Sequence, residues 1–233
     1  MVTVKEINRQ MLCFVAQQLT PLLDQFVFLG GCTTALFITD EAAPDVRVTH
    51  DVDVIVEVLS RYEYWQLEER LRGLGCVQDI NQELTCRWKL NGITLDVMPT
   101  DESILGFSNR WYAEAIHNAQ TVTLEEDLTI RLVTPVHFIA TKLEAFTGRG
   151  NNDFWGSHDL EDIVTVIDGR REILNELSAT EPGLRHYIAK TFSGFLTADG
   201  FREALSGHLP PDRASQERLP LLWQRLVAIS RLD

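Results

Sequence analysis

Two aspartates, Asp51 and Asp53, stand two positions apart at the start of an alternating apolar run. On a β-strand, side chains at positions i and i+2 point to the same face, so the two carboxylates share one face while Val52 points into the core. Two neighbouring carboxylates are costly unless a positive charge lies between them. A hard cation with oxygen ligands, Mg²⁺ above all or Mn²⁺, suits this arrangement. The pair therefore predicts a divalent-metal site.

A third carboxylate and a glycine pair extend this pattern. Asp96 lies in a second predicted strand, 93–98, with its apolar neighbours on the opposite face. Gly30 and Gly31 directly follow the buried strand predicted at Phe26–Leu29. Paired glycines let backbone N–H groups approach an anion closely, and a helix N-terminus behind them favours phosphate. Three acidic side chains on neighbouring strands beside a phosphate cradle predict a two-metal phosphoryl-transfer site with all three aspartates as ligands.

Hydrophobic periodicity predicts the elements that position these residues. The Asn91-Gly92 dipeptide between two strand-like runs predicts a tight β-hairpin. The pattern as a whole predicts an α+β fold, with a small mixed sheet flanked by helices in residues 1–133 and a helical C-terminal domain in 134–233. Helices are expected over 4–23, 32–39, 62–74, 109–118 and 134–147 and after Ser157, and strands over 26–29, 51–58, 76–80, 84–90, 93–98, 121–124 and 129–133.

These motifs resemble the nucleotidyltransferase superfamily that includes polymerase β, which carries Gly-Gly or Gly-Ser, a spacer, Asp-x-Asp and a later third Asp. More narrowly, the chain resembles the AbiEii-type toxin nucleotidyltransferases of abortive-infection and toxin–antitoxin systems. The matching residues are Gly30-Gly31-Cys-Thr-Thr-Ala, then Arg47-x-Thr49-x-Asp51-x-Asp53, then Thr134-Pro135 through Lys142-Leu143-Glu144 to Arg149, and Asp159-x-x-Asp162.

The resemblance implies a nucleotidyltransferase core that moves a nucleoside monophosphate from an NTP to an acceptor hydroxyl. It assigns metal and triphosphate binding to Asp51 and Asp53, with Asp96 as the third metal ligand and catalytic carboxylate. Asp159 is implied as an auxiliary acid or base, although relatives often carry Lys directly before it, where this chain has His158. The residues implied in nucleotide binding are Gly30, Gly31, Thr33, Arg47, Thr49 and Lys142.

Ordinary structural roles remain open for several of these residues. Asp96 is also compatible with the polar face of a hairpin strand, and Lys142 with a solvated charge on an amphipathic helix. Asp159 near the start of a helix also favours the positive end of the helix dipole.

The distribution of charge along the chain favours some classes of acceptor substrate over others. The chain carries a net charge of −13, yet residues 170–233 hold nine Lys+Arg and eight Asp+Glu, so the excess acid lies in residues 1–169. An acidic front half argues against broad nucleic-acid binding, which depends on Lys and Arg contacts to phosphate. The toxin-like resemblance implies an RNA acceptor, particularly tRNA, and a cognate antitoxin partner. An aminoglycoside-like small molecule suits the charge better, and a non-catalytic nucleotide-binding module is the third alternative.

The composition excludes several classes of protein. With 45% hydrophobic and 24% charged residues, the chain is typical of globular proteins and unlike collagen, coiled coils or disordered chains. The longest apolar runs are far below the ~20 residues of a membrane span, and the first residues do not form a signal-peptide pattern. Four scattered cysteines without a C-x-x-C pair do not indicate a zinc site. We therefore expect a cytoplasmic protein without membrane association.

Overall fold

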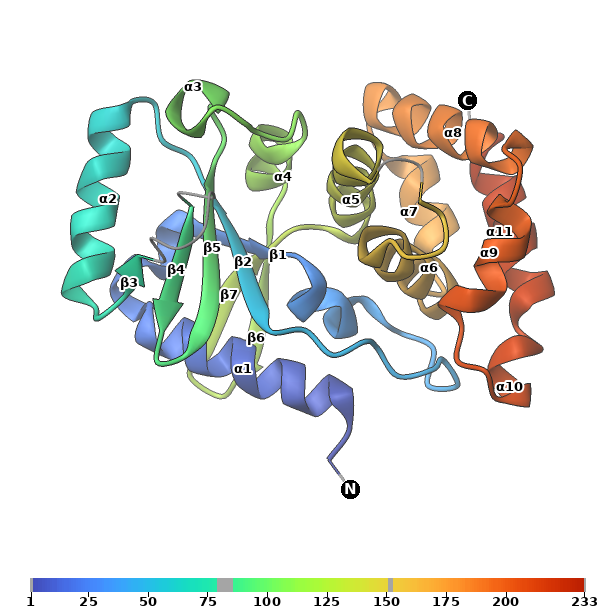
Figure 1. Cartoon of the computed structure of the whole chain (residues 1–233), viewed down its shortest axis with the longest axis horizontal. Coiled ribbons are helices and arrows are strands. Elements are labelled where there is room, and N and C mark those ends of the chain that lie inside the picture. Colours follow the sequence, from blue (N-terminus) through green and yellow to red (C-terminus); the bar gives the residue numbers. More distant parts are fainter. Residues whose placement is uncertain (1, 79–85, 151–152, 233) are drawn as a thin grey trace. The chain divides into compact units, whose positions relative to one another are not determined.

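The computed structural model describes residues 2–78, 86–150 and 153–232 (Figure 1). Its contacts divide the chain into two compact units. The sheet unit comprises residues 1–35 and 47–134, and the helical unit comprises residues 36–46 and 135–233. No helix within the described residues is long and apolar enough to cross a membrane.

The sheet unit is built on one seven-stranded mixed sheet with the strand order β3-β4-β5-β2-β1-β7-β6. The central strand β2 pairs antiparallel with β1 on one side and parallel with β5 on the other. The fully buried strand β1 therefore lies beside the strand that carries Asp51 and Asp53. The expected α+β fold class is confirmed. The strands are β1 (Phe26–Leu29), β2 (Asp51–Val56), β3 (Val77–Gln78), β4 (Arg87–Leu90), β5 (Ile93–Pro99), β6 (Gln120–Glu125) and β7 (Leu128–Leu132).

Local sequence signals explain where several elements begin and turn. Helix α1 (Val4–Gln18) starts after Thr3, whose hydroxyl accepts a hydrogen bond from the backbone N–H of Glu6, and it packs against β2, β6 and β7. Asn91 and Gly92 both adopt positive φ, at 49° and 87°, as a two-residue hairpin turn between β4 and β5 requires.

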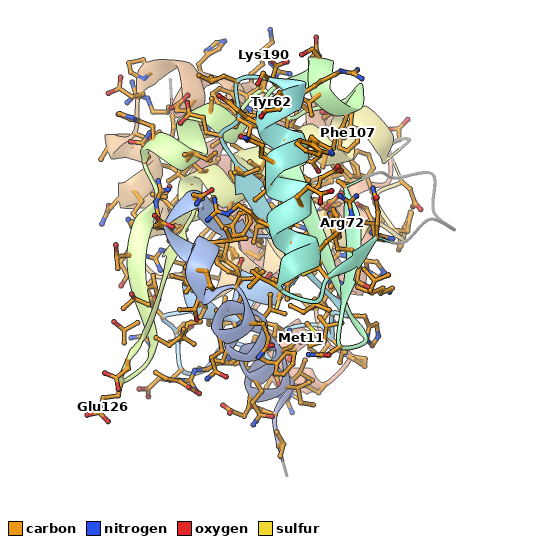
Figure 2. All side chains as sticks on the ribbon, turned by 90° about the vertical axis from the view of Figure 1, so that its left-hand side faces the viewer. Met11, Tyr62, Arg72, Phe107, Glu126 and Lys190 are labelled. Atoms are coloured by element: carbon orange, nitrogen blue, oxygen red, sulfur yellow. The ribbon has the colours of Figure 1, made fainter. Side chains whose placement is uncertain are left out.

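The sheet unit also contains one longer helix and several short ones. Helix α2 (Arg61–Gly73) begins at the Ser60 cap, and Figure 2 shows it along the facing side, with Tyr62 and Arg72 labelled toward its two ends. Its Tyr64 hydroxyl donates a 2.9 Å hydrogen bond to the carbonyl of Val97 in β5, which fixes the helix against the sheet. The shorter elements are η1 (Thr20–Gln25), α3 (Glu102–Leu105) and α4 (Tyr112–His117).

Two sequence expectations differ from the structure here. The short helix expected over 32–39 is a seven-residue 3₁₀ helix, η2 (Gly31–Phe37), so the glycines are followed by a 3₁₀ turn and not by the N-terminus of an α-helix. The helix expected over 4–23 is an α-helix followed by the separate 3₁₀ turn η1, because Pro21 cannot donate a backbone hydrogen bond within a continuing α-helix. The strands expected at 76–80 and 84–90 lie partly outside the described residues.

The helical unit is a bundle with a core rich in aromatic side chains. Phe146, Phe154, Phe195 and Phe201 contact one another with ring centroids 5.2–5.6 Å apart in edge-on, tilted and stacked pairs. Its elements are α5 (Pro135–Arg149), α6 (His158–Gly169), α7 (Ile173–Ala179), α8 (Pro182–Thr197), α9 (Phe201–Leu205), η3 (Ser206–His208), α10 (Arg213–Gln216) and α11 (Leu219–Ile229).

The segment 36–46 belongs to the helical unit although it lies early in the sequence. The backbone N–H groups of Thr39 and Asp40 donate to the carbonyl of Gly169, at 3.0 and 2.9 Å. The Asp40 carboxylate also pairs with Arg171 and Arg218, each at 2.8 Å. These contacts fix the segment to the end of α6. The domain boundary between residues 133 and 134 stays a prediction.

Candidate functional site

The loop after β1 brings Gly30 against Asp53. Gly30 has a φ of +79°, and a Cβ atom built on it would lie 2.6 Å from Asp53 Cγ and closer still to Asp53 Oδ2. This close approach follows from the pairing of β1 with β2, in which Leu29 lies opposite Asp53. The absence of a side chain at position 30 is therefore what lets the Asp53 carboxylate occupy its place beside the loop.

The second glycine faces Arg47 and Thr49. A Cβ atom on Gly31 would lie 3.1 Å from Arg47 Cζ and 2.8 Å from Thr49 Cγ2, so the guanidinium lies directly beside the glycine backbone. Buried Asn8 on α1 fixes this stretch: its amide donates to the Arg47 carbonyl at 2.9 Å and its oxygen accepts from the Thr49 N–H at 3.4 Å. One arginine, two carboxylates and two glycines are thus gathered where β1 ends and β2 begins.

Cys32 and Thr33 directly follow the two glycines in the chain, and both side chains are buried. Thr33 is fully buried, and its hydroxyl donates a 2.8 Å hydrogen bond to the Gly30 carbonyl, so it holds the shape of the turn from below. The Cys32 thiol donates to the Asn8 carbonyl at 3.3 Å. Burial first, then the charges of Asp53 and Asp51, raises the pKa of Cys32 to about 12. The thiol is therefore protonated at neutral pH and serves packing.

The three predicted metal ligands lie in two rows on one face of the sheet. Asp53 and Asp96 are direct neighbours in the parallel register of β2 and β5, and Asp51 lies opposite Thr94. Asp51 and Asp53 are half-buried, whereas Asp96 is buried and accepts two hydrogen bonds from Arg87, at 2.8 and 2.6 Å.

These positions fit a divalent cation at Asp51 and Asp53. Mg²⁺ keeps several waters and is bound by one or two protein carboxylates together with substrate phosphates, so this pair supplies a sufficient donor set. Within the described part of the chain, no three His, Cys, Asp or Glu side chains form a group able to hold a metal ion. Asp96, the third predicted ligand, accepts hydrogen bonds from Arg87 on both of its oxygens, and its role toward a metal ion stays a prediction.

Lys142 and Asp159 lie in the helical unit. The Lys142 ammonium pairs with Asp159 at 2.9 Å and with Asp162 at 2.8 Å, and Asp162 is only 1% exposed. His158, which precedes Asp159, is exposed and pairs with Glu161 at 3.1 Å. Lys142 is thus a half-buried member of an ion-pair cluster and not a solvated helix charge. The predicted roles of Lys142 and Asp159 toward a nucleotide stay predictions.

Two residues of the sheet unit that position the site were missed from the sequence. Asn8 could have been noticed in the sequence, because it is a polar residue on the same buried face of α1 as the apolar residues Leu12, Val15 and Ala16. Arg87 could also have been found from the sequence. The hairpin turn at Asn91-Gly92 fixes the register of the two strands, and that register places position 87 opposite position 96.

Comparisons with known proteins bear on the fold. No protein-family model matches the sequence, and no curated protein matches it. A crystal structure of an antigenic nucleotidyltransferase-like protein from Paracoccidioides brasiliensis matches this chain with a TM-score of 0.53 and 19% sequence identity, over 95% of this chain and 92% of that chain. At that identity the likeness shows the fold alone. The chain therefore has a nucleotidyltransferase-like fold.

Proposed function

We propose that this protein is a metal-dependent nucleotidyltransferase that moves a nucleoside monophosphate from an NTP to an acceptor hydroxyl. The observation that carries the proposal is the packing of Asp53 against Gly30 and of Arg47 against Gly31. It brings carboxylates, the Arg47 guanidinium and glycine backbone without side chains to one place. This combination suits a triphosphate and its counter-ion, since the arginine and the backbone contact phosphate oxygens while the carboxylates bind the ion. The nucleotidyltransferase-like fold of the whole chain supports the same reaction class.

In this proposal Asp51 and Asp53 hold a divalent cation, Mg²⁺ or Mn²⁺, which when bound neutralises charge on the triphosphate oxygens. Arg47 orients the triphosphate against the Gly30-Gly31 backbone, and Asn8 and Thr33 keep that loop in place. The acceptor oxygen bonds to the α-phosphorus in line with the breaking bond to the bridging oxygen, and pyrophosphate leaves. The acceptor proton passes to a carboxylate base, which we propose to be Asp96 or Asp159.

For the acceptor, the AbiEii-type resemblance leads us to propose an RNA end such as that of tRNA, with an antitoxin as protein partner. A small cationic acceptor, as in aminoglycoside nucleotidyltransferases, is the alternative that the acidic charge of residues 1–169 favours. A nucleotide-binding module without transfer activity is the remaining alternative.

The test is transfer of α-³²P-labelled NTPs, each in turn with Mg²⁺, to total tRNA and to an aminoglycoside panel. Asp51→Asn and Asp53→Asn should abolish labelling of whichever acceptor is used. Glu57→Gln is the matched control, because Glu57 is an exposed carboxylate directly after β2. Label on tRNA supports the toxin-like proposal, and label on a small molecule supports the alternative acceptor. No label on any acceptor together with intact NTP binding refutes the transferase proposal in favour of the non-catalytic module.

A further inference from the structure

A row of three charged residues crosses three adjacent strands of the sheet unit. Arg87 on β4 lies opposite Asp96 on β5 in the antiparallel register, and Asp96 lies beside Asp53 on β2 in the parallel register. Figure 1 shows the three strands next to one another. Directly paired residues on neighbouring strands project from the same face of a sheet, so the arginine and the two carboxylates share one face.

The arginine binds its carboxylate through both nitrogens of its fork. Arg87 Nε donates to Asp96 Oδ1 at 2.8 Å and Arg87 Nη2 donates to Asp96 Oδ2 at 2.6 Å. The arginine side chain is 23% exposed and the aspartate side chain 10%, so the pair is largely shielded from water. Such a bidentate pair fixes the orientation of the carboxylate plane as well as its charge.

The positive charge of Arg87 also acts on the Asp51–Asp53 region. An arginine guanidinium stays protonated at any physiological pH. Its charge lies in the cross-strand row that ends at Asp53, and Asp51 lies two residues from Asp53 on the same face of β2. A second divalent ion at Asp96 would have to displace this half-buried guanidinium or lie next to its charge, and both are unfavourable.

We propose that Arg87 takes the place of a second metal ion, so that the centre binds one divalent cation, on Asp51 and Asp53, while Asp96 serves as the counter-ion of Arg87. This inference rests on the proposed function and refines it, because the sequence pattern by itself predicts a two-metal site with Asp96 as a ligand. In this arrangement Arg87 is a positioning residue: it removes Asp96 from metal binding and supplies a fixed positive charge in the row beside Asp53.

The test counts metal ions. The full chain is titrated with MnCl₂, and free Mn²⁺ is followed by its electron paramagnetic resonance signal. The wild type should bind one ion per chain. Arg87→Gln should bind two, because it exposes both oxygens of Asp96, and the double variant Arg87→Gln/Asp96→Asn should return to one. Arg87→Lys keeps the charge but not the two-pronged contact, and it should bind one ion or gain a second at least tenfold more weakly than Arg87→Gln.

A matched control comes from the same strand. Lys89 lies on the same face as Arg87, two residues on, and its ammonium donates to the Thr94 hydroxyl at 2.6 Å instead of to a carboxylate. Lys89→Gln should therefore leave the count at one. If Arg87→Gln does not fold, Asp96→Asn alone decides the question: one ion with less than a threefold change in affinity is expected, and a tenfold or larger loss overturns the inference.

The other outcomes separate this inference from the proposed function. Two ions bound by the wild type, or a count of one that Arg87→Gln leaves unchanged, would overturn the role given to Arg87 and leave the transferase proposal standing. No ion bound by the wild type at millimolar Mn²⁺ would refute the metal centre on which both proposals depend.

Discussion

Replacing Gly30 by alanine tests the central packing feature of the candidate site. A Cβ atom at this position would lie 2.6 Å from Asp53 Cγ and 2.8 Å from Asp53 Cβ. Carbon atoms in good contact are about 3.5–4.0 Å apart, so the Asp53 side chain would have to move by about 1 Å. Alanine at a positive φ adds a backbone cost of about 1–2 kcal/mol, and an off-rotamer Asp53 adds about 1 kcal/mol.

We therefore expect Gly30→Ala to lower the free energy of unfolding by about 2–3 kcal/mol and nucleotide transfer by about a hundredfold, since a 1 Å misplacement of a reacting group costs about that much. Gly75→Ala is the matched control: its φ is +85°, and nothing lies within 4 Å of the added Cβ. It should lose about 1–2 kcal/mol through the backbone alone and keep full activity.

Urea titration followed by circular dichroism gives the unfolding free energies, and the labelled-NTP assay gives the rates. The informative quantity is the difference between the two alanine variants, because the backbone strain cancels in it. Equal stability of the two variants, combined with wild-type transfer by Gly30→Ala, would refute the inferred packing of Asp53 against the loop and its importance for the reaction.

Three further predictions concern charged groups. Asp51→Asn should lower transfer at least about a hundredfold, because we propose that Asp51 is a metal ligand. The melting temperature should stay within about 2 °C of that of Glu57→Gln, because Asp51 is half-buried at a strand end, and a collapse of the melting temperature would instead indicate a structural carboxylate. Hydrogen bonds first from Arg171 and then from Arg218 lower the pKa of Asp40, so the native state binds fewer protons there than the unfolded state and stability falls as the pH drops from about 5 toward 2. Asp40→Asn should flatten that acid limb in melts recorded from pH 7 to pH 2, and an unchanged limb would contradict the assignment. Lys142→Met should lower the unfolding free energy by about 3 kcal/mol, because it removes the ammonium that pairs with 1%-exposed Asp162; an unfolding curve superimposable on that of the wild type would contradict this.

Local signals predicted the parts of the fold that depend on local physics. The strand at Phe26–Leu29 is a run of four apolar residues, and all four are buried at the centre of the sheet. The hairpin at Asn91-Gly92 follows from the ease with which these two residue types adopt positive φ. The paired carboxylates of β2 share a face because side chains alternate along any strand.

The parts that were not predicted depend on contacts between distant residues. Nothing local to segment 36–46 reveals that Asp40 pairs with Arg171 and Arg218, which follow it by 131 and 178 residues. The 3₁₀ conformation of the helix after the glycine pair was also not predicted, because apolar spacing over so few residues does not distinguish a 3₁₀ helix from an α-helix. The partner of Asp96 is an intermediate case, because the hairpin register gives it once the turn is recognised.

The attachment of segment 36–46 to the helical unit has a consequence for the order in which the chain matures on the ribosome. Asp40 leaves the exit tunnel 178 residues before its partner Arg218, and at about 5–20 residues per second that interval is roughly 10–40 s. Throughout this time segment 36–46 lacks at least one of the two arginines that bind its Asp40. Segment 36–46 therefore reaches its complete set of contacts only when nearly the whole chain has been made, whereas Asn8, Thr33 and the β2 partners that hold the Gly30 loop all lie within the first 56 residues.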